Sequence, residues 1–159
     1  MDAVRDVLVE LPDEAATAGL AARLAGRARQ GDVIGLQGPL GSGKTSFARA
    51  FIRALGGGGE EVPSPTFTLV EIYAFAGKPP VWHFDLYRLS APEEAWELGI
   101  EEAWSEGISL IEWPERLGPL LPAEHLLLAL AEGADAGARL ARLAATPAWA
   151  ARLDGLADV

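Results

Sequence analysis

The sequence predicts an α/β fold with a mixed parallel and antiparallel sheet. Two patterns predict this class. In the first half of the chain, strand-like apolar runs alternate with segments of helical spacing, which is typical of parallel βαβ units. In the middle and near the end, strand-like runs follow one another across turns, which is typical of antiparallel hairpins. The length of 159 residues suits one domain, residues 1–159.

The first half of the chain predicts two strands and two helices. In order, we expect an edge strand, a helix, a buried strand and a second helix at residues 4–11, 13–31, 32–38 and 45–59. The first helix has Asp13 or Thr17 as its cap and Gly31 as its end. Four consecutive glycines end the second helix.

The second half predicts more strands than helices. We expect a β-rich run, a strand, a helical segment, a strand that becomes a Pro-rich loop, two strands joined by a Gly-rich turn and a final helix, at residues 66–73, 81–89, 90–107, 108–122, 125–146 and 146–157. Ser90 and Pro92 open the helical segment, with Glu93 as the capping-box partner. Thr146 caps the final helix, and Pro147 takes its first position.

Residues 38–45 read GPLGSGKT, which matches the phosphate-binding P-loop pattern, with a predicted strand before it and a helix after it. The glycines let backbone N–H groups turn inward around phosphate oxygens, and the helix start adds its dipole. Lys44 would reach the β- and γ-phosphates, and the Thr45 hydroxyl would bind Mg²⁺. The alternative is a Gly-rich turn with an incidental lysine. The fold class is therefore P-loop NTPase-like, and the predicted phosphate-binding residues are Gly38, Gly41, Ser42, Gly43, Lys44, Thr45 and Ser46.

The nucleotide base is not fixed by the P-loop, but the rest of the chain favours ATP over GTP. Ras-type GTPases read guanine with an Asn-Lys-x-Asp motif, and this chain contains no asparagine. Their Asp-x-x-Gly switch follows the P-loop, whereas the match in this chain, Asp32 to Gly35, precedes it.

Two apolar strand-like runs after the P-loop end in acids: VWHFD at Asp85 and SLIE at Glu112. Acids at the carboxyl ends of strands lie on the ligand-binding edge of an open α/β sheet. One could hold Mg²⁺ and the other could orient an attacking water, and their spacing leaves the two roles open. The alternative is an exposed strand-end acid in each case.

Four other residues have two interpretations each. Thr66, in SPTF at 64–67, could close over the γ-phosphate as a switch threonine, or the segment could be a turn that enters a strand. His83 could be catalytic or a hydrogen-bonded packing residue. Trp113 could stack on a base or pack in the core. Arg88 could contact a phosphate or pair with a nearby glutamate.

Composition excludes several classes of function. The net charge is −10 and the pI is about 4.6, so we expect no direct grip on a nucleic-acid backbone, and a nucleic-acid role would need a more basic partner. The absence of cysteine excludes disulfides and thiolate metal sites and is compatible with the cytoplasm. No apolar run approaches the ~18–20 residues of a membrane span, and the N-terminus lacks the apolar core of a secretory signal.

Five motifs in fixed order resemble the bacterial TsaE (YjeE) family, the ATPase needed for threonylcarbamoyladenosine synthesis on tRNA. They are GPLGSGKTSFARAF, VPSPTFTLVEIY, HFDLYRL, ELGIEE and LIEWPERL, and the likeness covers residues 10–145. The resemblance implies a P-loop NTPase-like three-layer sandwich of unusual topology, with the mixed sheet between helices. It also implies an ATP- and Mg²⁺-binding protein that hydrolyses ATP slowly by itself. It implies action with the threonylcarbamoyl transferase subunit and that subunit's paralogous dimer partner, tRNA adenosine 37 being reached only through the complex. ATP hydrolysis would reset the complex between rounds.

The resemblance also implies roles for particular residues. Lys44 and Thr45 would contact phosphate and Mg²⁺, Thr66 would belong to a switch-like loop, and Asp85 and Glu112 would be essential acids with Glu112 near the metal. The residues implied to approach the nucleotide are Asp13, Glu14, Thr17, Trp113 and Arg139. One departure is Pro39, where the family commonly has Asp.

Three hypotheses compete. The first is a partner-coupled ATPase for tRNA modification. The second is a small-molecule kinase, which usually needs an Arg-bearing lid; Arg116 is the only arginine between residues 89 and 138, which disfavours it. The third is a non-hydrolysing nucleotide-binding scaffold, which Asp85 and Glu112 disfavour.

Overall fold

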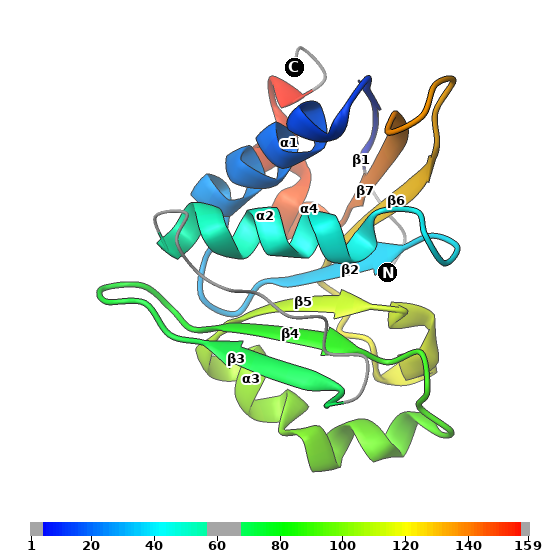
Figure 1. The fold of residues 1–159 in the computed structure, drawn as a ribbon. Coiled ribbons are helices and arrows are strands. Elements are labelled where there is room, and N and C mark those ends of the chain that lie inside the picture. Colours follow the sequence, from blue (N-terminus) through cyan, green and yellow to red (C-terminus); the bar gives the residue numbers. More distant parts are fainter. Residues whose placement is uncertain (1–4, 57–67, 157–159) are drawn as a thin grey trace.

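The computed structural model describes residues 5–56 and 68–156, and these residues form one mixed sheet of seven strands with helices on both faces (Figure 1). The strands are β1 (Arg5–Leu11), β2 (Val33–Gln37), β3 (Val70–Tyr73), β4 (Val81–Asp85), β5 (Ile108–Glu112), β6 (Leu126–Glu132) and β7 (Arg139–Ala145). The α-helices are α1 (Glu14–Arg27), α2 (Lys44–Gly56), α3 (Ile100–Glu106) and α4 (Pro147–Ala150). The 3₁₀ segments are η1 (Pro92–Leu98), η2 (Pro114–Leu120) and η3 (Ala151–Leu153).

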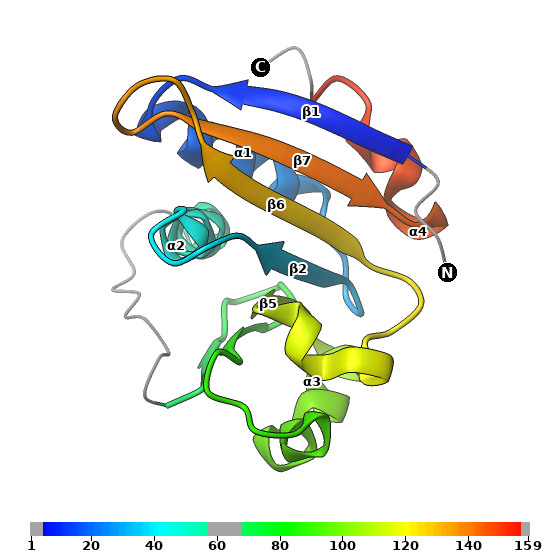
Figure 2. The same ribbon diagram turned by 90° about the vertical axis from the view of Figure 1, so that its right-hand side faces the viewer.

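The sheet has the strand order β1-β7-β6-β2-β5-β4-β3. Its centre is parallel, because β2 runs alongside both β5 and β6, and β4 runs alongside β5. The two sides are antiparallel: β1, β7 and β6 lie side by side on one (Figure 2), and β3 pairs with β4 on the other. The predicted mixed α/β fold and the edge position of the first strand are confirmed.

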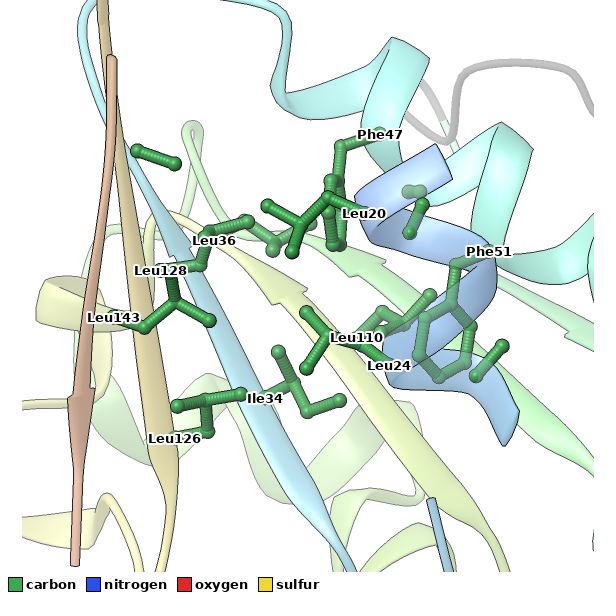
Figure 3. Close-up of a cluster of buried hydrophobic side chains, with 14 of the residues drawn as sticks. Leu20, Leu24, Ile34, Leu36, Phe47, Phe51, Leu110, Leu126, Leu128 and Leu143 are labelled. Atoms are coloured by element: carbon green, nitrogen blue, oxygen red, sulfur yellow. The ribbon is translucent and has the colours of Figure 1, made fainter. Parts of the chain in front are cut away.

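Two apolar clusters fill the layers on either side of the sheet. One joins the sheet to α1, α2 and α4, and Figure 3 shows Leu20 and Leu24 of α1 and Phe47 and Phe51 of α2 among the leucines of the strands. The other joins β2, β4 and β5 to η1, α3 and η2. Burying each such leucine or phenylalanine stabilises the fold by about 1.5–3 kcal/mol. The predicted three-layer arrangement follows from these two clusters.

The first helix starts where the sequence predicts and ends earlier. Asp13 is the N-cap, and its carboxylate accepts a hydrogen bond from the N–H of Ala16 at 2.8 Å. The helix ends at Arg27 rather than at Gly31. Gly31 has φ +91° and donates its N–H to Gly107 O at 2.8 Å, so it shapes the turn into β2 rather than the helix end.

The predicted helical segment at 90–107 is two shorter pieces, η1 and α3. Gly99 separates them with φ +80°, a left-handed conformation that ends a right-handed helix. The capping-box residue is Glu94 and not Glu93, since the Glu94 carboxylate accepts from the N–H groups of Ser90 and Ala91 at 2.6 and 2.8 Å.

Two other predicted elements are shorter in the structure. The strand predicted at 81–89 ends at Asp85. The final helix is α4 followed by η3, with Pro147 in its first turn. Thr146 precedes it without capping it, because the hydroxyl donates to His125 O and accepts from His125 N–H, both at 2.8 Å. No helix in the described part of the chain is long and apolar enough to cross a membrane.

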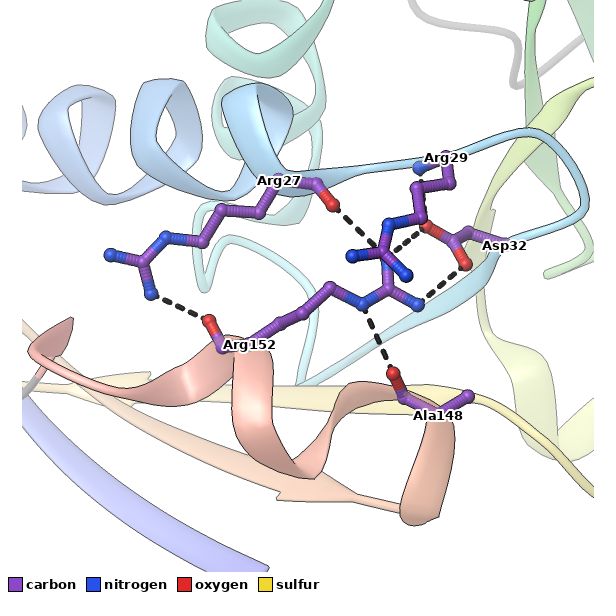
Figure 4. A network of polar contacts seen from close by, with 5 residues as sticks. All are labelled: Arg27, Arg29, Asp32, Ala148 and Arg152. Atoms are coloured by element: carbon purple, nitrogen blue, oxygen red, sulfur yellow. Dashed lines mark hydrogen bonds and ion pairs between the residues drawn. The ribbon is translucent and has the colours of Figure 1, made fainter.

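Arg152 attaches the C-terminal segment to the connection between α1 and β2 (Figure 4). Its guanidinium donates to both carboxylate oxygens of Asp32 at 2.7 and 3.0 Å, and both side chains are about one-tenth exposed. It also donates to Arg27 O and Ala148 O, each at 3.0 Å, and lies 4.0 Å from the Trp149 ring centroid. The bidentate pair and these backbone bonds make Arg152 a structural residue.

We expect Arg152→Ala to lower the free energy of unfolding by about 2–4 kcal/mol, because it leaves the Asp32 carboxylate and two carbonyls in a mostly buried place without this donor. Chemical denaturation measures the change. Arg142→Ala is the matched control, since Arg142 pairs with Asp6 at 3.0 Å on the exposed surface, and it should change stability little. Equal effects of the two substitutions would contradict this interpretation.

Candidate functional site

Residues 38–43 connect β2 to α2 as a tight loop at the carboxyl edge of the parallel strands. A Cβ atom at Gly38 would lie 2.5 Å from Ser42 Oγ and 2.6 Å from Leu130 O, so the loop packs too closely there for any side chain. Gly43 has φ +101°, and a Cβ on it would lie 3.3 Å from Arg139 Nε. The conformation of this loop therefore depends on glycine at these two positions.

Lys44 begins α2 and lies across the loop. Its ammonium donates to Gly38 O, and to Pro39 O at 3.0 Å. It also lies 4.1 Å from the ring centroid of Trp113, a cation–π distance. Trp113 itself has φ +62°, an uncommon conformation for a bulky residue, and this turn of the chain directs its ring toward Lys44.

The electrostatic surroundings of Lys44 are mixed. Burial lowers the pKa of Lys44 below its ordinary value, since only 5% of the residue is exposed. The carboxylates of Glu112, Asp85 and Glu115 raise the pKa and oppose the shift. The net result is a buried cation close to several acids, a place where an anionic ligand can add a favourable charge interaction.

Arg139 supports the loop from the opposite side. It is the first residue of β7, and its guanidinium donates to Ser42 O at 2.7 Å, to Gly41 O at 3.4 Å and to Ala138 O at 2.8 Å. These bonds fix the orientation of the Gly41 and Ser42 carbonyls. Because the C=O and N–H groups of one peptide point in opposite directions, the same bonds fix the direction of the N–H groups that follow.

The two predicted acids meet at the neighbouring ends of β4 and β5, where Asp85 pairs in register with Glu112. They are 5% and 3% exposed, so the alternative of exposed strand-end acids is wrong. Glu112 accepts from the Thr45 hydroxyl at 3.0 Å through Oε1 and 3.1 Å through Oε2, and Oε2 lies 2.7 Å from His83 Nε2. Asp85 Oδ1 accepts from the N–H of Tyr87 at 3.1 Å.

Thr45 and Glu112 fit a magnesium site of the kind that phosphate ligands complete. Both offer hard oxygen atoms, and the hydrogen bond between them holds these oxygens together. Among the described residues, no group of three or more His, Cys, Asp or Glu side chains forms a metal cage. Mg²⁺ needs no such cage when a carboxylate, water and phosphate oxygens supply its ligands.

Two adjoining cavities surround the loop. One, of about 280 Å³, is lined from the loop and α2 by Gly41, Gly43, Lys44, Thr45 and Ser46, and from the strand ends by Asp85, Glu112, Trp113 and Arg139. The other, of about 270 Å³, is lined by Glu14 and Thr17 of α1 together with Ser46, Arg49, Arg53 and Arg139. Gly43, Ser46 and Arg139 line both cavities.

The structure thus brings most of the predicted site residues together. Gly38 and Ser42 shape the loop without lining either cavity, and Thr66 lies outside the described residues. Sequence reasoning did not select Tyr87, Arg49 or Arg53, which line the cavities. Tyr87 contacts Trp113 with ring centroids 4.8 Å apart. Arg49 and Arg53 follow Ser46 by three and seven positions, so helical spacing puts them on the same face of α2 as Ser46. That spacing was the available signal.

Comparison with protein families finds a match over residues 11–141 to the family described as threonylcarbamoyl adenosine biosynthesis protein TsaE. A relative from Rickettsia conorii, named tRNA threonylcarbamoyladenosine biosynthesis protein TsaE, is 43% identical over 111 residues. That match covers 70% of this chain and 63% of the relative, less than two thirds of its length. A Synechocystis relative of the same name is 46% identical over 121 residues, 72% of this chain and 73% of the relative.

Among solved structures, the crystal structure of YdiB from Bacillus subtilis is similar over nearly the whole chain. The TM-score is 0.79 at 28% sequence identity, covering 97% of this chain and 95% of YdiB. The predicted resemblance is confirmed by these matches.

We expect Lys44→Ala to reduce affinity for ADP and ATP by about ten- to hundredfold, because it removes the ammonium that a phosphate would contact. Isothermal titration calorimetry measures the affinity. The matched control is Lys78→Ala, since Lys78 is exposed and donates to Leu55 O at the far end of α2. Unchanged nucleotide affinity in Lys44→Ala would contradict the assignment of this loop to phosphate binding.

Proposed function

This chain belongs to the family of threonylcarbamoyl adenosine biosynthesis proteins TsaE, and from this premise we propose that it is an ATP-dependent P-loop ATPase required for threonylcarbamoylation of tRNA. One observation carries the proposal. The P-loop lysine and threonine share a cavity with two buried carboxylates, one of which already accepts a hydrogen bond from the threonine. Phosphate binding, metal binding and activation of water need these groups in one place.

The two cavities suggest how a nucleotide lies in the site. The phosphates belong in the cavity of Lys44 and Thr45, where loop N–H groups and the start of α2 favour negative charge. The nucleoside belongs in the adjoining cavity beside Glu14 and Thr17, since Arg139 and Ser46 line both spaces. A nucleoside triphosphate is large enough to need the space of both cavities.

The hydrogen bonds favour different roles for the two acids. Glu112 is bonded to the Thr45 hydroxyl, so it belongs on the metal side of the site. Asp85 ends the neighbouring strand and lines the same cavity as Lys44 and Thr45, so we assign it to orienting the attacking water. Mg²⁺ bound at Thr45 and Glu112 would neutralise charge that develops on the phosphates. Trp113 would cover the phosphate end of the site.

The partners that we propose are the threonylcarbamoyl transferase subunit and its paralogous dimer partner, with adenosine 37 of tRNA reached only through that complex. The net charge of −10 supports this arrangement, because the chain lacks the excess of Lys and Arg that binding to phosphate backbones needs. In this proposal the isolated chain hydrolyses ATP slowly, and hydrolysis resets the complex between rounds. The switch role of Thr66 and the cytoplasmic location stay predictions.

We expect Glu112→Ala to keep nucleotide affinity within about tenfold of the wild type, a change of ~1.4 kcal/mol or less, while hydrolysis stops. The P-loop contacts with phosphate remain, but the carboxylate on the metal side is lost. Calorimetry and a phosphate-release assay with Mg²⁺ separate the two effects. Glu97→Ala is the control, because it removes an exposed carboxylate that lines neither cavity. Persistent hydrolysis in Glu112→Ala would refute this role.

The whole proposal is tested by reconstitution. With the purified transferase complex and tRNA, multiple-turnover modification should require this chain and ATP, and Lys44→Ala should fail to support it. Single-turnover modification should need the chain far less if hydrolysis resets the complex. Multiple-turnover modification at full rate without the chain would overturn the proposed function and leave the nucleotide site intact.

A further inference from the structure

A buried histidine lies directly behind the metal-side acid. His83 is fully buried on β4, and its Nε2 atom lies 2.7 Å from Glu112 Oε2. Side chains two residues apart on a strand share a face, so His83 lies on the same face as Asp85, one step deeper in the core. Glu112 therefore contacts Thr45 toward the cavity and His83 toward the interior.

The chemistry of this pair fixes the direction of the hydrogen bond. A carboxylate only accepts hydrogen bonds, so Nε2 must carry the proton and donate it. The other ring nitrogen, Nδ1, is buried and has no hydrogen-bond partner among the described residues. A histidine with only a packing role would need no carboxylate 2.7 Å from its Nε2 atom. A short hydrogen bond to a charged acceptor is also stronger than one between neutral groups.

We propose that His83 is a positioning residue for Glu112: its Nε2–H bond holds Oε2 against the core and so fixes the carboxylate beside the Thr45 hydroxyl, the two groups that would hold Mg²⁺. This inference rests on the proposed function. Without the bond, the Glu112 carboxylate keeps only the Thr45 hydroxyl among the described residues and can rotate about its last side-chain torsion. Groups that orient a ligand in this way typically change metal affinity by about 10- to 100-fold when removed.

Two substitutions separate the bond from the packing. The amide nitrogen of Gln lies close to the place of a histidine Nε2, whereas the amide nitrogen of Asn lies close to the place of Nδ1. His83→Gln therefore keeps a donor toward Glu112, and His83→Asn keeps a polar residue without that reach. His83→Met is a third variant, in case His83→Asn does not fold. Met has the length of Gln, has no side-chain N–H and suits a buried position.

The measurement is affinity for a non-hydrolysable ATP analogue, determined by calorimetry in EDTA and over a series of Mg²⁺ concentrations. Melting temperature checks that each variant is folded. In EDTA we expect all variants to bind within about threefold of the wild type, because the loop and Lys44 are unchanged. The Mg²⁺ concentration for half-maximal enhancement should rise by about tenfold or more in His83→Asn and His83→Met and stay near the wild type in His83→Gln.

The outcomes distinguish this inference from the function on which it rests. Wild-type Mg²⁺ dependence in all folded variants, or an equal loss in Gln and Met, would overturn the role of His83. The P-loop assignment would then stand as long as Lys44→Ala still loses affinity. If the wild type itself shows no Mg²⁺ enhancement, the magnesium part of the proposed function fails, and the inference fails with it.

Discussion

The fixed backbone of the P-loop is the constraint on which the site depends. Its carbonyl groups need hydrogen-bond donors, because unpaired buried carbonyls are costly. Lys44 and Arg139 supply these donors, from the start of α2 and the start of β7. A loop in the first third of the sequence is thus held by a residue almost a hundred positions later in the chain.

The order of strands explains why the chemical groups meet. β2 lies between β6 and β5, and β4 follows β5, so the loop after β2 and the acids that end β4 and β5 share one edge of the sheet. Parallel strands carry their carboxyl ends to the same edge, where ligands bind in open α/β folds. Trp113 follows β5 directly, and its left-handed backbone turns the ring back over Lys44. Topology brings the acids close, and local backbone geometry closes the site.

The sequence was sufficient for the fold class, for the octet and for both strand-end acids, because each leaves a local signal: alternation, helical spacing or a glycine pattern. It was insufficient where contacts between distant parts of the chain override the local preference of a segment for a helix or a cap. Gly99 breaks a segment of helical composition, and the Thr146 hydroxyl is used by His125 rather than by the helix it precedes. The bond between His83 and Glu112 joins two strands, so no spacing along the chain reports it. The division of the site into two cavities likewise depends on how α1, α2 and β7 pack.

The pairing of β1 with β7 has a consequence for the way the protein is made. Arg5 opposes Ala145 and Leu11 opposes Arg139, so β1 can pair only after β7 has been synthesised. Contacts this distant in sequence are slow to close, because a long loop must lose its freedom before they stabilise it. The P-loop is synthesised before β7, but Arg139, which donates to the loop carbonyl of Ser42, is the first residue of β7. Until β7 has been synthesised, the loop therefore lacks the support of Arg139, and a complete nucleotide site depends on that strand.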